Sequence, residues 1–371
     1  MSTKDRKTDH IFIVLTEEVE EKDPLFSKVH LVHQSTPEVD FNSIDTSIEF
    51  LGYKLSIPLM ITGMTGGNEL GEYFNRVLAI AAEKHKIAVG VGSQRVAIED
   101  TGVKKSFRVV REEAGNVPVV ANIGAQQLKK SRDPLETARL VVEMIEADAL
   151  AIHLNPAQEI FQVGGDRDYK GVLNAIKKVV EKLEVPVIAK ETGAGISMEC
   201  ASKLWSIGVR YFDVAGAGGT SWVKVEAIRA KAYDRNDLYE AGTTFREWGI
   251  PTVLSVIETR YSAPRAFIIA SGGVRNGLDI AKSIAIGADM AGMALPLLKA
   301  ASRGAKVLDD LIERIKLEFK AAMFLTGCMN IYELRRTPVV LESDVVNWVK
   351  QRGIDLGEYI SKTRVTMKRG N

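Results

Sequence analysis

Glycine-rich turns stand at two successive places in the chain, each directly after a short apolar run. They are GAGGTS (Gly216–Ser221) and SGGVRNG (Ser271–Gly277), and a helical pattern follows the second. Glycines let the backbone approach a phosphate and point its N–H groups at it, and a helix start adds partial positive charge. Glycines also make tight turns that bind nothing. Two such turns in succession, with Gly292–Ala294 after the next run, predict a phosphate site.

A third turn, His153–Glu159, gathers an imidazole, two amides and a carboxylate. One carboxylate is a weak metal site by itself, but Mg²⁺ needs only one or two when a substrate phosphate supplies other oxygens. Glu159 can equally be an acid favoured at a helix start by the helix dipole. Gln158 is neutral and cannot be a conventional base. His153 can be a base or can only position a ligand.

Lys190 ends another apolar run. A buried lysine is costly unless it meets an anion or does chemistry. Three interpretations remain open, namely an ion pair with a carboxylate of a neighbouring strand, a cation beside the electron-rich edge of a cofactor ring, and a Schiff-base nucleophile. Near the start of the chain, Arg6, Lys7 and His10 could hold an anion, although short basic N-termini are usually solvated.

The elements that must position these residues form one repeating pattern, in which a short apolar run leads through a polar turn into a helical stretch. Eight runs read as strands: Ile57–Ile61, Ile87–Val91, Pro118–Asn122, Ala149–His153, Pro186–Lys190, Arg210–Val214, Ala266–Ala270 and Asp289–Met293. They are apolar throughout, as in a parallel sheet buried on both faces. Their starts recur about every 30 residues, the size of a βαβ unit.

Eight such units predict a single α/β domain, a (β/α)₈ TIM barrel over residues 51–300 with its site at the carboxyl ends of the strands. Residues 1–50 form an N-terminal extension, and residues 301–371 form C-terminal helices. The long spacing between Val214 and Ala266 predicts an insertion after the sixth strand that contains two helical stretches.

Composition excludes several classes of protein. The 371 residues include 49 Lys plus Arg and 48 Asp plus Glu, a net charge of +1, which gives no global attraction for nucleic acid or anionic membranes. Two cysteines, Cys200 and Cys328, exclude a disulfide scaffold and a cysteine-based zinc cluster, and we expect both to be inert. With no signal core and no apolar run of about 18 residues, the predicted location is the cytoplasm.

Together, these motifs resemble those of the type 2, flavin-dependent isopentenyl-diphosphate isomerases over nearly the whole chain. The matching segments are RKxxH (Arg6, Lys7, His10), MTGG (Met64–Gly67), SQR (Ser93–Arg95), ANIGA (Ala121–Ala125), HLNPxQE (His153–Glu159), KETGxGIS (Lys190–Ser197), GxGGTSW (Gly216–Trp222) and SGGVRNGLD (Ser271–Asp279). HLNPxQE is highly specific, whereas the glycine turns alone would match many flavin barrels. Gly164–Gly171 varies in this family, so nothing is carried over from it.

The resemblance implies an FMN-binding barrel that uses Mg²⁺, with NADPH to reduce the flavin. The implied reaction is the reversible 1,3-allylic proton shift between isopentenyl and dimethylallyl diphosphate in isoprenoid biosynthesis. It has no net redox change, and reduced flavin acts as acid and base near its N5. The family tends to form homotetramers or homooctamers.

The resemblance also implies roles for individual residues. The substrate diphosphate is held by Arg6, Lys7, His10, Ser93, Arg95 and Asn155. The flavin contacts Thr62, Gly63, Met64, Thr65, Ser93, Asn122, Lys190, Thr220, Gly272, Gly273, Arg275, Ala294 and Leu295. Glu159 shares Mg²⁺ with the substrate. The catalytic candidates are Gln158, His153 and Lys190, and Lys190 is expected at the N1/O2 edge of the flavin. The N-terminal segment is expected to fold over the barrel mouth as a lid.

Three other classes of protein are alternatives to this family. The 2-hydroxy-acid oxidases carry an HGxR segment late in the barrel that is absent here, and inosinate dehydrogenases carry a cysteine where Gly216–Trp222 has none. A Schiff-base aldolase would use Lys190 as its nucleophile and would be colourless. A non-catalytic flavin or phosphate-binding barrel would bind FMN without exchanging solvent deuterium into isopentenyl diphosphate.

Overall fold

The computed structural model describes residues 3–365, and its centre is a closed barrel of parallel strands. The strands are β4 (Leu59–Ile61), β5 (Ala88–Gly90), β6 (Val119–Gly124), β7 (Ala149–Leu154), β8 (Val187–Glu191), β9 (Tyr211–Asp213), β10 (Phe267–Ser271) and β11 (Met290–Met293). They follow one another around the barrel in chain order, and β11 pairs with β4 to close it. Each overlaps one of the eight predicted strands, so the predicted (β/α)₈ barrel is confirmed.

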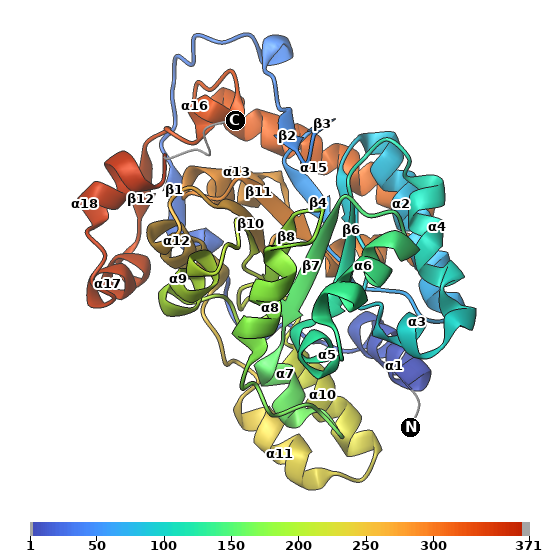
Figure 1. Cartoon of the computed structure of the whole chain (residues 1–371). Coiled ribbons are helices and arrows are strands. Elements are labelled where there is room, and N and C mark those ends of the chain that lie inside the picture. Colours follow the sequence, from blue (N-terminus) through green and yellow to red (C-terminus); the bar gives the residue numbers. More distant parts are fainter. Residues whose placement is uncertain (1–2, 366–371) are drawn as a thin grey trace.

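The helices surround these strands (Figure 1). They are α1 (Thr3–Thr16), α2 (Glu69–His85), α3 (Arg95–Glu99), α4 (Lys105–Glu113), α5 (Ala125–Lys130), α6 (Pro134–Met144), α7 (Pro156–Phe161), α8 (Val172–Val180), α9 (Met198–Ser206), α10 (Trp222–Ala232), α11 (Asn236–Thr244), α12 (Thr252–Ser262), α13 (Gly277–Ala285), α14 (Leu295–Ala301), α15 (Ala305–Leu325), α16 (Ile331–Leu334), α17 (Ser343–Gln351) and α18 (Leu356–Glu358). None of these helices is long and apolar enough to cross a membrane.

A hairpin closes the end of the barrel where the strands begin. It consists of β2 (Ile48–Phe50) and β3 (Tyr53–Leu55), which are antiparallel. Phe50 and Leu55 are buried in a cluster with inward-facing strand residues such as Met60 and Val120. Because this end is plugged, the open mouth lies at the carboxyl ends of the strands.

The N-terminal extension divides among three places. Helix α1 packs against α10 and α14 at the mouth, while the β2–β3 hairpin lies at the opposite end (Figure 1). Between them in sequence, β1 (Val29–Leu31) pairs antiparallel with β12 (Val339–Leu341) near the C-terminus. Only α1 is therefore placed to act as the predicted lid. The predicted outer segments also include residues 1–2 and 366–371, which lie outside the described part.

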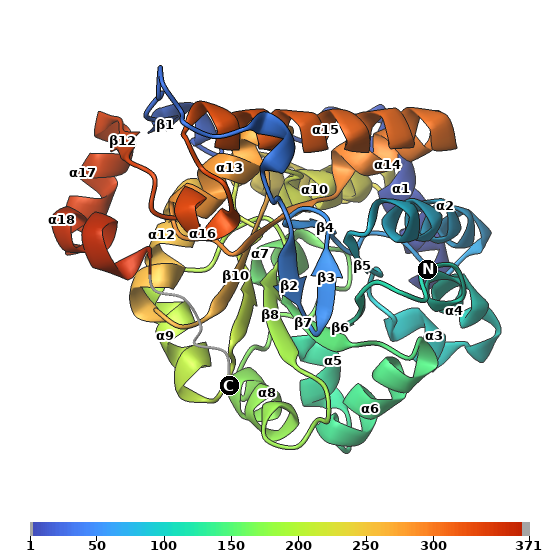
Figure 2. The same ribbon diagram turned by 90° about the horizontal axis from the view of Figure 1, so that it is seen from above.

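The insertion after the sixth strand contributes α10 and α11, while α12 packs on β10 and α9 as an outer barrel helix. After the eighth strand, α14 leads into α15, which runs along α13 and also contacts α2 (Figure 2). Helix α15 therefore completes the ring of outer helices next to the first of them.

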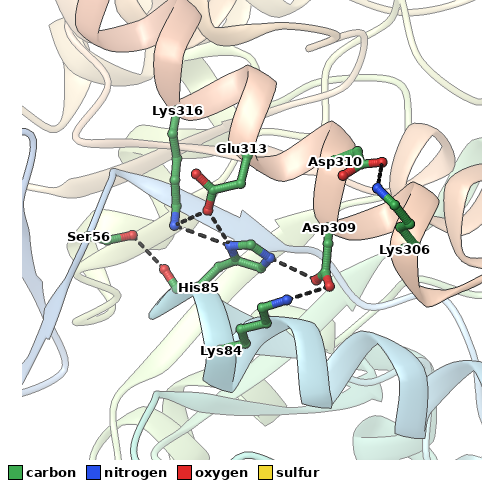
Figure 3. A network of polar contacts seen from close by, with 8 residues as sticks. All are labelled: Ser56, Lys84, His85, Lys306, Asp309, Asp310, Glu313 and Lys316. Carbon is green, nitrogen blue, oxygen red and sulfur yellow. Dashed lines mark hydrogen bonds and ion pairs between the residues drawn. The ribbon is translucent and has the colours of Figure 1, made fainter.

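A polar network joins α15 to α2 at this seam (Figure 3). The buried His85 ring lies between two carboxylates, with Nε2 2.9 Å from Asp309 and Nδ1 2.9 Å from Glu313. Lys84 adds an ion pair to Asp309, and Lys316 lies beside Glu313. Two polar side chains of α2 and three of α15 thus fix the junction between the first and last units of the barrel.

Candidate active site

A single cavity at the mouth brings together every site residue predicted from the sequence. It is lined by the carboxyl ends of the barrel strands, the loops that follow them and helix α1. The predicted residues that line it are Arg6, Lys7, His10, Thr62, Gly63, Met64, Thr65, Ser93, Arg95, Asn122, His153, Asn155, Gln158, Glu159, Lys190, Thr220, Gly272, Gly273, Arg275, Ala294 and Leu295.

The glycine turns form one crowded wall of this cavity. Gly272 and Gly273 have φ of 98° and 78°, a conformation that strains other residues. A Cβ on Gly272 would lie 2.1 Å from the Gly216 carbonyl oxygen, and one on Gly273 would lie 2.6 Å from that of Gly218. The glycines therefore let the loops after strands six and seven pack directly against each other.

Lys190 both pairs with a carboxylate of a neighbouring strand and lines the cavity. The predicted ion pair is therefore confirmed, and the two other interpretations stay predictions. Its Nζ lies 2.7 Å from Asp213 Oδ2, and the other carboxylate oxygen accepts a 2.5 Å hydrogen bond from the Ser271 hydroxyl. All three residues end adjacent barrel strands. The lysine thus presents an ammonium group to the cavity from a fixed position.

His153 is held as a neutral ring. Its Nδ1 donates to Asn122 Oδ1 at 2.8 Å, which leaves Nε2 as an acceptor. Burial, reinforced by the charges of Lys7, Lys190 and Arg6, lowers the pKa of His153 to about 3. A group with so low a pKa is a weak base at neutral pH, which favours positioning over general-base catalysis.

A chain of hydrogen bonds fixes both amides of the His153–Glu159 turn. Tyr169 donates to Asn155 Oδ1 at 3.2 Å, and Asn155 Nδ2 donates to Gln158 Oε1 at 3.0 Å. Gln158 Nε2 in turn donates to Glu226 Oε1 at 3.0 Å. Each amide has one acceptor and one donor end engaged, so neither can flip without losing a bond. Gln158 is therefore presented to the cavity in one orientation.

Glu226, on the inserted helix α10, is the anchor of this chain and is fully buried. The same Oε1 lies 2.8 Å from His10 Nε2 of α1, and Oε2 accepts a 2.6 Å hydrogen bond from Arg229. Burial alone would raise the pKa of this carboxyl, but its contacts with His10 and Arg229 lower it to about 2. One ionised carboxylate thus connects helix α1, the insertion and the His153–Glu159 turn.

Glu159 lies in the first turn of helix α7 and borders the cavity. Its Oε1 accepts from Asn155 at 3.1 Å, and its Oε2 accepts from the Gln162 side chain at 3.1 Å and the Asp166 backbone N–H at 2.6 Å. Burial raises the pKa of this carboxyl. Among the residues that the structure describes, no three His, Cys, Asp or Glu side chains are grouped to hold a metal ion. A cation at Glu159 would therefore need oxygens from a substrate.

Several basic side chains of the site already form hydrogen bonds or ion pairs within the protein. Lys7 Nζ donates to the Ser93 carbonyl oxygen at 3.0 Å, and burial together with Arg6 lowers its pKa to about 7. Arg95 bonds Glu99 of its own helix at 2.7 Å. Arg275 is ion-paired with Glu20 of the N-terminal extension, an interaction that its sequence motif does not indicate.

Sequence reasoning missed three residues that hold the site together. Asp213 lay in a predicted strand beside Lys190, and a carboxylate inside an apolar run was the available signal. Glu226 gave no such signal, because it lies three residues from Arg229 in an ordinary helical pattern. Tyr169 falls in Gly164–Gly171, the variable segment from which no role was carried over.

The barrel fold and a matching family model together identify the class of this chain, the FMN-dependent (β/α)₈-barrel proteins. A family model described as FMN-dependent dehydrogenase matches residues 156–341. Solved structures of mandelate oxidase variants share the fold. The alignment with one of them covers 90% of this chain and 93% of the mandelate oxidase chain, at a TM-score of 0.60. The alignment with another covers 92% of this chain and 99% of the mandelate oxidase chain, at a TM-score of 0.63. Both are 15% identical in sequence to this chain.

Closer relatives identify the family within this class. An isopentenyl-diphosphate delta-isomerase of Metallosphaera sedula is 46% identical over 97% of this chain and 99% of its own length. Those of Sulfurisphaera tokodaii and Methanothermobacter thermautotrophicus are 45% and 43% identical, over 98% and 97% of this chain and 99% of their own. The chain belongs to the isopentenyl-diphosphate delta-isomerase family of enzymes, in its FMN-dependent, type 2 form, as its motifs predicted.

Proposed function

We propose that this chain catalyses the reversible 1,3-allylic proton shift between isopentenyl and dimethylallyl diphosphate, using reduced FMN and Mg²⁺. The observation that carries the proposal is the composition of the single mouth cavity. Its glycine wall suits a flavin phosphate, and the cations of α1 face the His153–Glu159 turn across the remaining space. The proposal also includes NADPH as reductant, a cytoplasmic location and a homotetramer or homooctamer, which stay predictions.

The flavin side of the cavity would be formed by strand-end residues. Gly272, Gly273, Arg275, Ala294 and Leu295 would surround the phosphate, and Lys190 would lie at the N1/O2 edge of the ring. The remaining contacts would come from Thr62, Gly63, Met64, Thr65, Ser93, Asn122 and Thr220. When bound, reduced FMN supplies an acid and base near its N5 for the alkene.

On the substrate side, Arg6, Lys7 and His10 would hold the diphosphate together with Ser93, Arg95 and Asn155. Glu159 would bind Mg²⁺ jointly with the diphosphate oxygens, as Mg²⁺ sites with few protein carboxylates do. Gln158 would lie beside the alkene in its single orientation, and neutral His153 would orient substrate or flavin. With α1 across the mouth, water would be kept from the developing positive charge on the alkene.

An anaerobic assay tests this proposal directly. The enzyme is incubated with FMN, NADPH, Mg²⁺ and isopentenyl diphosphate, and dimethylallyl diphosphate is measured. We expect product and, in D₂O, solvent deuterium in the substrate. FMN bound and reduced without product or exchange would overturn the isomerase proposal. A colourless protein that borohydride traps with a carbonyl substrate would indicate the aldolase alternative.

Removing the Arg6 guanidinium should weaken substrate binding selectively. Hydrogen bonds between charged groups contribute about 1.5–3 kcal/mol, so Arg6→Ala should raise the substrate KM by roughly 10- to 100-fold. Initial rates and a flavin titration measure the two sides of the cavity separately. FMN affinity should match that of the wild type. An unchanged KM would remove Arg6 and the lid from the substrate site.

Lys7 should make substrate binding depend on pH near neutrality. Its lowered pKa of about 7 means that the ammonium group is present below this pH and lost above it. The diphosphate binds the charged form, so kcat/KM should fall as pH rises past about 7, by up to tenfold per unit. Lys7→Gln should lower kcat/KM at low pH and abolish this limb. A limb that persists in Lys7→Gln would assign it to another group.

A further inference from the structure

Asp213 is a buried carboxylate whose two oxygens are both committed at the carboxyl ends of the barrel strands. It is 1% exposed. In the register of β8 and β9 it lies directly across from Lys190, and Oδ2 is 2.7 Å from the lysine Nζ. Oδ1 accepts from Ser271 of β10 at 2.5 Å. The pair is therefore held from three adjacent strands.

The neighbouring charges of this pair are otherwise engaged or neutral. Glu191 follows Lys190 but accepts hydrogen bonds from the backbone N–H groups of residues 192–194, at 2.5 to 2.7 Å. On the other side of Lys190, the register places His153, whose lowered pKa keeps it uncharged. Asp213 thus offsets the Lys190 charge at close range. Together they present a nearly neutral pair to the cavity instead of a full positive charge.

We propose that Asp213 is a positioning residue of the flavin site that acts through Lys190, fixing its ammonium group and offsetting its charge. The inference rests on the proposed function, in which Lys190 faces the N1/O2 edge of FMN. In that function, reduced flavin would both give up a proton to the alkene and regain one. A full positive charge at that edge would favour the anionic reduced form, and Asp213 moderates this preference.

The test measures the midpoint potential of bound FMN in the holoenzyme, together with the pH at which reduced FMN loses its N1 proton. In Asp213→Asn the uncompensated lysine should favour reduced over oxidised FMN by about tenfold, equivalent to a potential about 30 mV higher. The N1 proton should be lost at lower pH. Lys190→Met should shift both readouts in the opposite direction.

A double-mutant cycle separates action through Lys190 from a general effect of charge. In the Lys190→Met background no ammonium group remains to be positioned, so adding Asp213→Asn should shift the potential by less than it does in the wild type. A full shift in that background, or no shift from Asp213→Asn alone, would overturn the proposal. If Asp213→Asn fails to fold, Ser271→Ala replaces it. Without the Ser271 hydroxyl, the Asp213 carboxylate would direct more of its negative charge at the Lys190 ammonium group, so the midpoint potential of FMN should fall. An unchanged or higher midpoint potential would contradict the inference.

These outcomes are distinct from failure of the proposed function. Wild-type enzyme that binds and reduces FMN but forms no dimethylallyl diphosphate would overturn the isomerase proposal alone. The potentials of the variants would still decide the role of Asp213. Conversely, an active isomerase whose flavin potential ignores Asp213→Asn would overturn this inference alone.

Discussion

Glu159→Gln should lose Mg²⁺-dependent isomerisation by about a thousandfold while keeping its yellow, flavin-bound colour. A metal ion that neutralises substrate charge contributes several kcal/mol to transition-state stabilisation, and each 1.4 kcal/mol is about tenfold in rate. Among the described residues, no three His, Cys, Asp or Glu side chains are grouped to hold a metal ion without the substrate. The measurement is kcat/KM against Mg²⁺ concentration, with flavin absorbance recorded for each sample.

Gln162→Ala is the matched control for this variant. It removes the amide that donates to Glu159 Oε2 at 3.1 Å but leaves the carboxylate in place. Its activity should keep the Mg²⁺ dependence of the wild type. An active Glu159→Gln enzyme with the wild-type response to Mg²⁺ would exclude the metal role, and the carboxylate would then only close the turn through Asp166 and Asn155.

Glu226→Ala should reduce both stability and turnover. Removing one partner of a buried ion pair costs about 3–5 kcal/mol, and here Arg229 would lose its 2.6 Å carboxylate contact. The same truncation frees Gln158 and His10, so kcat should fall by about 10²-fold or more as orientation is lost. Urea unfolding and single-turnover rates measure the two losses separately.

Asp9→Asn provides the comparison for Glu226→Ala. Asp9 is a more exposed partner of Arg229, at 3.2 Å, and is not part of the hydrogen-bond chain from Glu226 to Gln158. A partly exposed ion pair contributes about 0–1 kcal/mol, so this variant should keep nearly normal stability and turnover. If Glu226→Ala kept the wild-type kcat after its stability had fallen, the chain from Glu226 to Gln158 would have no part in catalysis.

The barrel and the lining of its mouth could be predicted because they repeat. Each unit shows the same order of buried run, polar turn and helix, so Lys190 and the glycine turns could be placed at strand ends from their spacing alone. The motifs then indicated which ligands those turns would face.

What could not be predicted was the contacts between units. Glu226 reaches His10 across 216 residues, and neither residue type nor spacing marks such a pairing. The ion pair between Arg275 and Glu20 is hidden for the same reason, since a basic residue in a phosphate-type loop does not show which acid lies nearby. The three-way division of the N-terminal extension follows from partners that occur late in the chain.

That division has a consequence for how the protein is made. Strand β1 can pair with β12 only after residue 341 has been synthesised. The contacts of His85 with Asp309 and Glu313, which join α2 to α15, likewise form only after those two residues have been synthesised. Contacts between such distant segments form slowly, because a long loop must close before they contribute. The edge of β4 therefore stays unpaired in the nascent chain until β11 has been synthesised and pairs with it. The seam between the first and last units is therefore a place where nascent chains of this protein are exposed to mispairing.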